Sequence, residues 1–359
     1  MSKTLGMDPK NFMFGIISGG IRDVTPTSFL YSIDPKNLSE WKYIGPLANF
    51  GLNLRPSRWS GDLGKNWEVT NFLSLNDEND PRSSYDLLIM GTEGCLRDGV
   101  EESLSSSGPS RPPRGQLWMS GNLRKDEATG SASISYEFGG HLDHGCLYAA
   151  NSFFDPRSQK QIVWGWITEE DLCDELRHQQ GWGGTLSMPR QLYLQTLHNV
   201  IGSLVSELPC ITSVRLKSED DGTLTIQTLA SYEKSTEMTF LPQTETFEIH
   251  RPSLFRPDSS LLINSSRETA PHTLFTTIDT SGEESTETLD IRAWRDNSVL
   301  EVFVNGRTVI STRLYVAEET VGMRFFAEED EASTTTVLRT SHTGLTELKF
   351  ANLWDGIKV

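Results

Sequence analysis

Short apolar runs separated by turn residues follow one another along the first half of the chain, without the 3.6-residue period of a helix. Runs of this length, bounded by Gly, Pro, Asn and Asp, are typical of β-strands. They are FGIISGG (14–20), TSFLYSID (27–34), WKYIGPL (41–47), NFLSLND (71–77), YDLLIMGTEG (85–94), QLWMSGNL (116–123), SASISYEF (131–138), HLDHGCLYAANSFFD (141–155) and KQIVWGWI (160–167). The pattern predicts an all-β architecture.

Two segments of this half depart from the strand pattern. Residues 101–115, EESLSSSGPSRPPRG, are rich in Ser, Pro and Gly and predict a surface loop. Residues 169–181, EEDLCDELRHQQG, are the best candidate for one or two helical turns. Gly183 and Gly184 then break any helix, and Pro189 closes the unit. We therefore expect a first domain over residues 1–190 and a second over residues 191–359.

The second half alternates apolar and polar residues, as in a half-buried antiparallel sheet. Its clearest unit is SVLEVFVNGRTVISTRL (298–314), in which Asn305–Gly306 suits the positive φ angles of a type I′ turn. Several such strands predict a two-sheet sandwich. Because this half offers no cluster of reactive side chains, we expect it to be an accessory domain that stabilises the first or contacts sugar.

Charge narrows the classes of partner. The 359 residues include 32 Lys plus Arg and 49 Asp plus Glu, a net charge of −17. This balance argues against nucleic acid or an anionic membrane as partner and favours a neutral ligand. No run approaches the roughly 20 apolar residues that cross a bilayer. The start of the chain also lacks the apolar core of a signal peptide.

The cysteines and histidines predict neither a metal site nor another cofactor. Four scattered cysteines form no C-x-x-C pair, so one disulfide or four free thiols both stay open: Cys95, Cys146, Cys173 and Cys210. His141 and His144 are three apart, a spacing that does not bring two rings together in a strand-and-turn segment. Two N-x-S sequons, at Asn37 and Asn264, would be surface acceptors in a secreted protein.

One carboxylate stands out in WSGDLGKNWEVTNFLSL (59–75). Glu68 lies between Trp67 and a run rich in β-branched and apolar residues, as expected for an acid at the start of a strand, partly out of water. Such an environment lets a carboxyl group keep a proton near neutrality. Most glutamates beside an aromatic residue are solvated strand ends, and only about one in ten is functional. The segment alone therefore does not decide the role of Glu68.

Several segments together resemble glycoside hydrolase family 32, in the branch of fungal fructosyltransferases and invertases. WEVTNFLSL resembles the W-E-C-P-N-type motif that carries the acid/base glutamate of that family. HLDHGCLYAANSFFDPRSQKQIVWGWI followed by GWGGTLSMPRQL is similar to its passage from propeller to sandwich, and SVLEVFVNGRTVISTRLY to its sandwich hairpin. The resemblance extends over essentially the whole chain, in the order of the family.

The resemblance implies a five-bladed β-propeller followed by a β-sandwich, with the active site in the axial funnel of the propeller. Its substrates would be sucrose, fructo-oligosaccharides, inulin or levan. Cleavage of the β-fructofuranosyl bond with retention needs two carboxylates about 5–5.5 Å apart.

By position Glu68 would be the acid/base. The substrate-binding side chains would be Asp143, in LDHG, Trp166, in WGW, Trp59, and Asn151, which stands where some members have a lysine. Alternatively, Asp143 is a turn residue, and Trp164 and Trp166 pack between blades.

The chain departs from the family at its start, which has no W-M-N-D-P-N-G-type motif with the nucleophilic aspartate. Arg22 and Asp23 resemble the second motif, R-D-P, but their surroundings fit the segment after it better. We therefore expect an N-terminally truncated propeller whose first two blades are missing.

Exposed blade edges would favour self-association. Two interpretations stay open: an incomplete form of a longer extracellular enzyme, or a catalytically inactive remnant that binds carbohydrate, with intracellular retention as the alternative location. For the chain as given we expect no measurable hydrolysis of sucrose or inulin.

Overall fold

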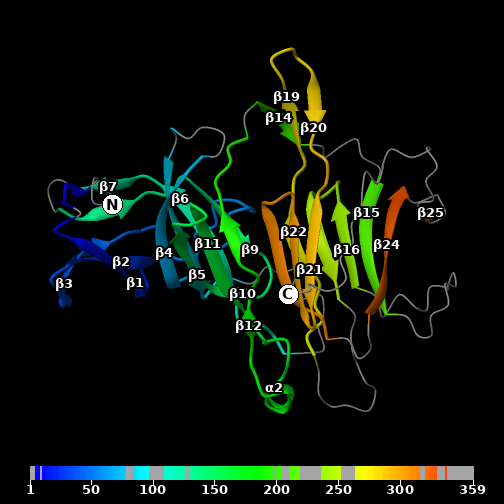
Figure 1. Ribbon diagram of the computed structural model, residues 1–359, viewed down its shortest axis with the longest axis horizontal. Coiled ribbons are helices and arrows are strands. Elements are labelled where there is room, and N and C mark those ends of the chain that lie inside the picture. The colour runs from blue at the N-terminus through cyan, green and yellow to red at the C-terminus, as the bar shows by residue number, and fades with distance from the viewer. Residues whose placement is uncertain are drawn as a thin grey trace.

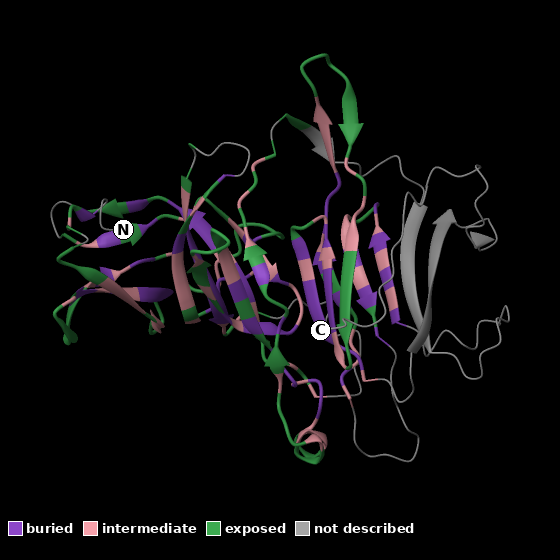
Figure 2. Ribbon diagram, viewed as in Figure 1, coloured by how far each residue is buried: buried purple, intermediate pink, exposed green. Residues whose placement is uncertain are grey.

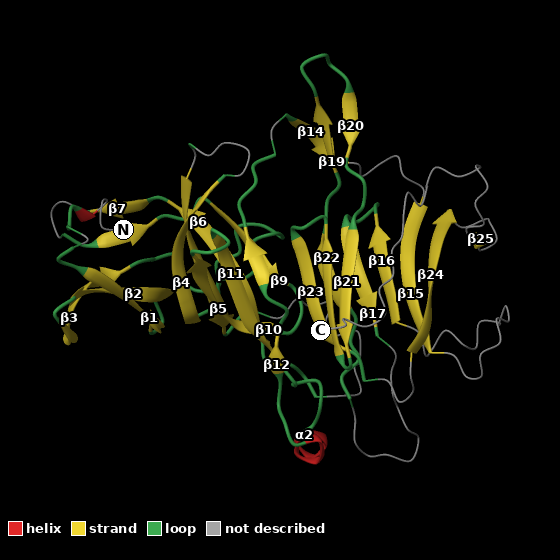
Figure 3. Cartoon of the chain, in the orientation of Figure 1, coloured by secondary structure: helices red, strands yellow, loops and turns green. Residues whose placement is uncertain are grey.

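The computed structural model describes residues 5–8, 10–77, 82, 84–96, 109–126, 130–197, 199–203, 210–218, 236–251, 263–315, 320–329 and 336–337. Most of these residues lie in antiparallel strands, which confirms the predicted all-β class (Figure 3). Helix α2 (Asp174–Gln180) falls inside the interval predicted to be helical. It ends at Gly181, whose φ of 81° places it in the left-handed region that favours glycine.

Three sheets follow one another in the first half of the chain, side by side from the blue end of Figure 1 to its centre. Each is antiparallel and resembles a propeller blade. A two-stranded ribbon, β7 (Leu123–Lys125) and β8 (Ala132–Ile134), accompanies them. The first sheet is β1 (Met13–Ile21), β2 (Thr25–Asp34) and β3 (Asn37–Pro46); the second is β4 (Asn66–Asn76), β5 (Ser84–Glu93), β6 (Arg114–Gly121) and β9 (Phe138–Asp143); the third is β10 (Leu147–Asp155), β11 (Lys160–Ile167), β12 (Thr185–Leu186) and β13 (Arg190–Leu192).

Strand β5 explains how these sheets stack. Successive side chains of a strand point to opposite faces. Leu88 and Met90 accordingly join the core shared with Leu30 of the first sheet. Leu87 and Ile89 join the core that β10 and β11 of the third sheet complete. The run LLIM is continuously apolar because both faces of its strand are buried (Figure 2).

The second half forms the predicted two-layer sandwich. A third core lies between its layers and contains Phe240, Phe247, Leu300, Val302 and Ile310. The larger layer consists of β18 (Glu268–Pro271), β17 (Thr246–His250), β16 (Thr236–Leu241), β15 (Cys210–Ser218), β24 (Thr320–Glu329) and β25 (Thr336–Val337). The other layer consists of β21 (Ile291–Asp296), β22 (Val299–Val304) and β23 (Thr308–Arg313), and a small sheet of β14 (Val200–Ser203), β19 (Phe275–Ile278) and β20 (Glu284–Thr286) projects beyond both.

The hairpin between β22 and β23 has the predicted turn. Asn305 and Gly306 have φ angles of 48° and 65°, and the Arg307 N–H donates to the Val304 carbonyl at 3.1 Å. Two residues with positive φ in sequence are the mark of a type I′ turn, so the Asn–Gly prediction is confirmed.

Buried ion pairs join the blades to the sandwich. Arg190 of β13 binds Asp143 of β9 at 2.9 Å and Glu301 of β22 at 2.6 Å. Arg313 of β23 binds Glu169, which follows β11, at 2.9 Å. The third sheet itself continues through β13 to Leu192, two residues past the boundary that we expect at residue 190. That boundary stays a prediction.

Several expectations need correction. The His141 and His144 rings stack with centroids 4.1 Å apart, although their spacing did not predict contact. They meet because β9 ends at Asp143 and the chain turns, with the His144 N–H bonded to the Val309 carbonyl. Asn264 is only 5% exposed, so it is not a surface acceptor, whereas Asn37 is exposed.

The loop expected over residues 101–115 is only partly described. Residues 101–108 lie outside the described residues, and Arg114 and Gly115 already belong to strand β6, so this end of the loop prediction was wrong. Three of the cysteines, Cys95, Cys146 and Cys173, are free thiols. In the part of the chain that the structure describes, no helix is long and apolar enough to cross a membrane.

Candidate functional site

Glu68 lies near the start of β4, where the strand departs from regular pairing. The preceding Trp67 is buried, and its indole N–H donates to the Leu63 carbonyl at 3.0 Å, which anchors the strand. Pairing with β5 shifts register between Glu68 and Asn71, and Val69 has a φ of 45°. Such a bulge redirects a side chain. The Glu68 side chain is therefore half-buried at an irregular point, and not solvated at a strand end.

Tyr148 of β10 faces Glu68 across a glycine. Glu68 pairs with Gly91, and a Cβ on Gly91 would come within 2.9 Å of the Tyr148 ring. Burial first, and then the negative charges of Glu68 and Glu93, raise the pKa of Tyr148 well above its usual range. The phenol is therefore a neutral hydroxyl at physiological pH. The close approach of the hydroxyl to the Glu68 side chain also contributes to the raised pKa of Tyr148.

Arg114, the first residue of β6, extends the group. Its guanidinium lies 4.0 Å above the centre of the Tyr148 ring and 5.8 Å from that of Trp166. It also forms an ion pair of 2.7 Å with Glu170. Tyr148 and Trp166 are cross-strand partners on β10 and β11. We call Glu68, Tyr148, Arg114 and Trp166 the Glu68 cluster.

The Glu68 cluster combines a half-buried carboxyl group, a neutral phenol, a cation and an indole that is 37% exposed. The carboxyl group can exchange a proton, the phenol can donate a hydrogen bond, and the indole offers an apolar face for a sugar ring. The nearby Glu93 already accepts a hydrogen bond from the Asn66 amide at 3.1 Å. The cluster thus has the parts of an acid/base site.

Asp143 lies at the other end of the same cross-strand row. The register runs from Glu68 through Gly91 and Gln116 to Asp143. Three interstrand steps of about 4.8 Å put roughly 14 Å between the two backbones. Asp143 is 2% exposed, and its oxygens accept from the Gly145 N–H, the Arg190 guanidinium, and the N–H and hydroxyl of Ser311, at 2.8, 2.9, 3.0 and 2.6 Å. This geometry favours the turn-residue alternative for Asp143 over contact with a ligand.

The other predicted site residues lie in different parts of the structure. Trp166 belongs to the Glu68 cluster. Asn151 is exposed, and its side-chain oxygen accepts from the N–H of Ser152 at 2.8 Å. Trp59 lies where the loop before β4 meets the sandwich, because the Arg58 guanidinium above its ring pairs with Glu245 at 2.7 Å. The structure brings Trp166 to the cluster, whereas Asp143 lies at the far end of the row and Trp59 packs against Arg58.

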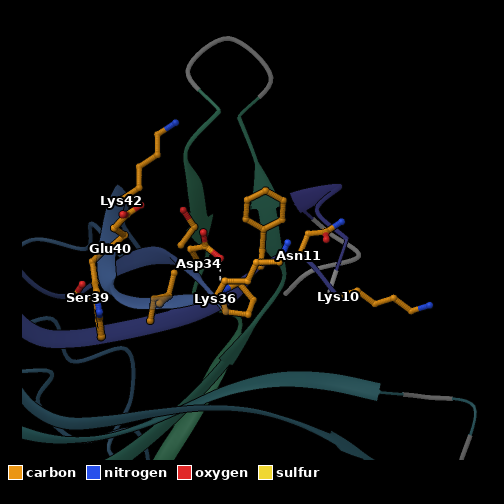
Figure 4. A pocket seen from close by; sticks show the side chains of 12 residues that line it. Lys10, Asn11, Asp34, Lys36, Ser39, Glu40 and Lys42 are labelled. Carbon is orange, nitrogen blue, oxygen red and sulfur yellow. Dashed lines mark hydrogen bonds between the residues drawn. The ribbon is translucent and has the colours of Figure 1, made fainter.

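A hollow of about 690 Å³ opens elsewhere, at the edge of the first sheet. Figure 4 shows Lys36 beside Asp34 in this hollow, with Glu40 and Lys42 on the neighbouring strand and Lys10 pointing outward. Its lining includes no residue of the Glu68 cluster. Among the described residues, no group of three or more His, Cys, Asp or Glu is placed to hold a metal ion.

Tyr148 and Arg114 were not expected from the sequence to belong to the site. Arg114 belongs to the segment predicted as a surface loop, and Tyr148 lies in the segment from which only Asp143 and Asn151 were expected to bind substrate. One signal was present. Gly91 interrupts the apolar strand YDLLIMGTE, and a glycine inside a strand often marks the close approach of another group, which here is the Tyr148 ring.

Known proteins share both halves of the chain. Residues 10–205 match the glycosyl hydrolases family 32 N-terminal domain, and residues 188–342 match the family 32 C-terminal domain. A β-fructofuranosidase of Oryza sativa, insoluble isoenzyme 3, is 41% identical over 58 residues, which are 16% of this chain and 10% of the relative. Fructan 1-exohydrolase w3 of Triticum aestivum is 43% identical over 54 residues, 15% of this chain and 9% of the relative.

Solved structures show the same fold. The Aspergillus kawachii β-fructofuranosidase complexed with glycerol superposes with a TM-score of 0.68 at 23% identity, covering 91% of this chain and 66% of that one. The fructosyltransferase of A. japonicus gives 0.66 at 24% identity, covering 90% and 64%. This chain thus spans just under two thirds of the length of these proteins. The likeness confirms the expected order of propeller blades followed by a sandwich. Because the family 32 N-terminal domain matches more than half of this chain, the chain belongs to glycosyl hydrolase family 32.

Proposed function

We propose that this chain acts on the β-fructofuranosyl bonds of sucrose or fructans, with Glu68 as the acid/base. The observation that carries the proposal is the setting of Glu68, half-buried at a β-bulge beside the neutral phenol of Tyr148. Relatives named β-fructofuranosidase and fructan 1-exohydrolase support the substrate class. So does a chicory (Cichorium intybus) structure of the same fold solved with 1-kestose, at 15% identity and a TM-score of 0.52.

In this mechanism Glu68 protonates the leaving glycosidic oxygen while a nucleophilic carboxylate bonds to the anomeric carbon of fructose. Glu68 then takes a proton from the incoming water or sugar, whose oxygen displaces that carboxylate. The Tyr148 hydroxyl donates toward the Glu68 carboxylate or a substrate oxygen. The Trp166 indole packs against a sugar ring, while Arg114, held by Glu170, keeps the two aromatic side chains in place. Asn151, and more remotely Asp143 and Trp59, stay predicted substrate contacts.

A second candidate function is the binding of fructosides without turnover. A retaining mechanism needs a nucleophilic carboxylate about 5–5.5 Å from the acid. Of the described carboxylates around the cluster, Glu93 is bonded to Asn66 and Glu170 to Arg114. Both are engaged as structural partners, which favours the expectation that the chain as given releases no measurable fructose.

The experiment compares fructose release and binding for three proteins: the unaltered chain, Glu68→Gln and the control Glu175→Gln on exposed helix α2. Release from sucrose or 1-kestose that falls on the order of 10²–10⁴-fold in Glu68→Gln alone supports catalysis by Glu68. Binding of 1-kestose by calorimetry without release supports the second candidate. If the unaltered chain neither binds nor cleaves, both candidates are wrong.

We further propose that the protein is extracellular. We also propose that it self-associates through its first sheet. The outward face of this sheet bears Ile17, Trp41 and Tyr43, which are 47%, 46% and 52% exposed. Trp41 and Tyr43 contact Tyr31 ring to ring, with centroids 5.7 and 5.4 Å apart. An exposed apolar patch on a sheet commonly marks an interaction site. Sedimentation velocity over a range of protein concentrations tests the association.

A further inference from the structure

Two β-bulges face each other next to the proposed acid/base. In β4 the register shifts between Glu68 and Asn71, and in β10 it shifts between Tyr148 and Asn151. Each bulge contains a residue other than glycine with positive φ, Val69 at 45° and Ala149 at 50°. For a β-branched residue such as valine this conformation is strained, and it persists only where the surroundings determine it.

The surroundings in question are two amide side chains of the second sheet. At a bulge, backbone groups lose their partners in the ladder. The Ala150 N–H instead donates to the Gln116 side-chain oxygen at 3.0 Å, and the Asn71 amide donates to the Ala150 carbonyl at 3.0 Å. Both backbone groups of Ala150 are thereby satisfied from the neighbouring sheet.

Asn71 serves both bulges at once. Its amide nitrogen also donates to the Val69 carbonyl at 2.9 Å, inside its own bulge. Its oxygen accepts from the N–H and the hydroxyl of Ser152, at 2.8 and 3.2 Å. A primary amide offers two donors and one acceptor oxygen in a rigid plane, which this arrangement requires. Aspartate has the same shape but, when ionised, cannot donate.

We propose that Asn71 and Gln116 are positioning residues, which hold the two bulges so that Glu68 and Tyr148 keep one mutual geometry across two blades. This inference rests on the proposed function and adds to it the device that aims the acid and the phenol. Neither amide needs to touch substrate. Asn71 bonds to the backbone of Val69, next to Glu68, and to that of Ala150, two residues after Tyr148. Gln116 bonds to Ala150 from the centre of the row that contains Glu68.

The test uses Asn71→Asp, with Asn37→Asp as the matched control, because the exposed Asn37 side chain bonds within its own turn. The ionised carboxylate of Asn71→Asp would face two carbonyls. At pH 7 we expect amide hydrogen exchange at Ala150 and Ser152 to quicken about tenfold in Asn71→Asp and not in the control. Near pH 4 the carboxyl group takes up a proton and becomes a donor again, so the exchange rates, each normalised to the unaltered chain at the same pH, should return.

Binding of 1-kestose gives a second readout. Asn71→Asp should bind about tenfold more weakly at pH 7 and recover at pH 4 relative to the unaltered chain, while Asn37→Asp binds normally. If the unaltered chain binds no fructoside, the proposed function fails, but hydrogen exchange still decides whether Asn71 holds the bulges. If Asn71→Asp fails to fold, Asn71→Ser, which keeps a donor and an acceptor, is measured in its place. Exchange at Ala150 and Ser152 equal to that of the control, or binding that does not follow the exchange, would overturn the inference.

Discussion

Glu68 and Asp143 occupy the two ends of one cross-strand row, and the sequence singled out both as members of a sugar site. Their surroundings differ. The Glu68 side chain is half-buried beside the neutral phenol of Tyr148, whereas Asp143 is buried and accepts four hydrogen bonds, three of them from residues of β13 and β23. The row thus ends in the proposed acid/base site on one side and in buried ion pairs with the sandwich on the other. A carboxylate whose lone pairs are already occupied has little left to offer a ligand.

Removing Asp143 should have the largest effect on stability. Asp143→Ala leaves the buried Arg190 without one of its two carboxylate partners, so we expect a loss of about 3–5 kcal/mol. Glu68→Ala, with no such network, should cost less than about 1 kcal/mol. Urea denaturation of the two variants measures the difference. An Asp143→Ala protein that keeps its stability but loses 1-kestose binding would make Asp143 a ligand after all.

Acid should lower the stability of the folded chain around His144 and His272. Burial first, then His141 and His272, lower the pKa of His144 well below its usual range. Burial and then Arg307 lower that of His272 to about 4. As the pH falls through about 6.5, these two histidines bind protons in the unfolded chain but stay neutral in the folded chain. Stability is therefore fully present above pH 6.5 and declines toward pH 4.

The His272 contribution alone is on the order of 3 kcal/mol. Thermal unfolding between pH 7 and pH 4 checks the decline. His272→Gln should flatten the curve, while His178→Gln on exposed helix α2 should leave it unchanged. A curve that rises toward pH 4 would contradict the assignment.

Gly91→Ala should disturb the Glu68 end of the cross-strand row. The added methyl group would lie 2.9 Å from the Tyr148 ring, so the ring or the strand must move, at about 1–3 kcal/mol. Because Tyr148 would leave its place beside Glu68, fructoside binding should fall as well. Gly183→Ala, where nothing lies within 4 Å, is the control. Unfolding and calorimetry on both variants make the measurement, and equal behaviour would mean that the Tyr148 position is unimportant.

The smallest stability effect concerns the open face of the first sheet. Ile17→Lys should change the free energy of unfolding by no more than about 0.5 kcal/mol, because its side chain is 47% exposed. The same change should weaken self-association. Leu38→Lys, at the second residue of β3, where the side chain is 62% exposed, should leave association intact. Sedimentation velocity distinguishes them, and a monomer at all concentrations would remove the proposed dimer face.

The regular elements could be predicted because they depend on local chemistry. The Asn305–Gly306 turn, the strand periods and the helix at α2 follow from turn residues and apolar spacing. The motif WEVTN singles out Glu68, whose catalytic role stays a prediction. Arg114 and Tyr148 could not be singled out in this way, since their roles arise where strands far apart in sequence meet at Gly91. The stacking of His141 on His144 likewise depends on a turn after Asp143 that spacing alone does not reveal.

Strand β5 carries a consequence for how the chain finds its alignment. The run LLIM (87–90) is apolar on both faces of β5. Shifting the register of β5 by one residue would therefore exchange the side chains between the two cores and expose little apolar surface. Burial therefore cannot choose between the two alignments. Two contacts that a shifted register would break distinguish the alignments. The Asp86 carboxylate accepts a hydrogen bond from the Ser74 hydroxyl at 2.6 Å, and at Gly91 only a hydrogen atom fits under the Tyr148 ring. Substitution of Asp86 or Gly91 is therefore expected to favour a wrong register of β5, in addition to removing the contacts of the altered side chain.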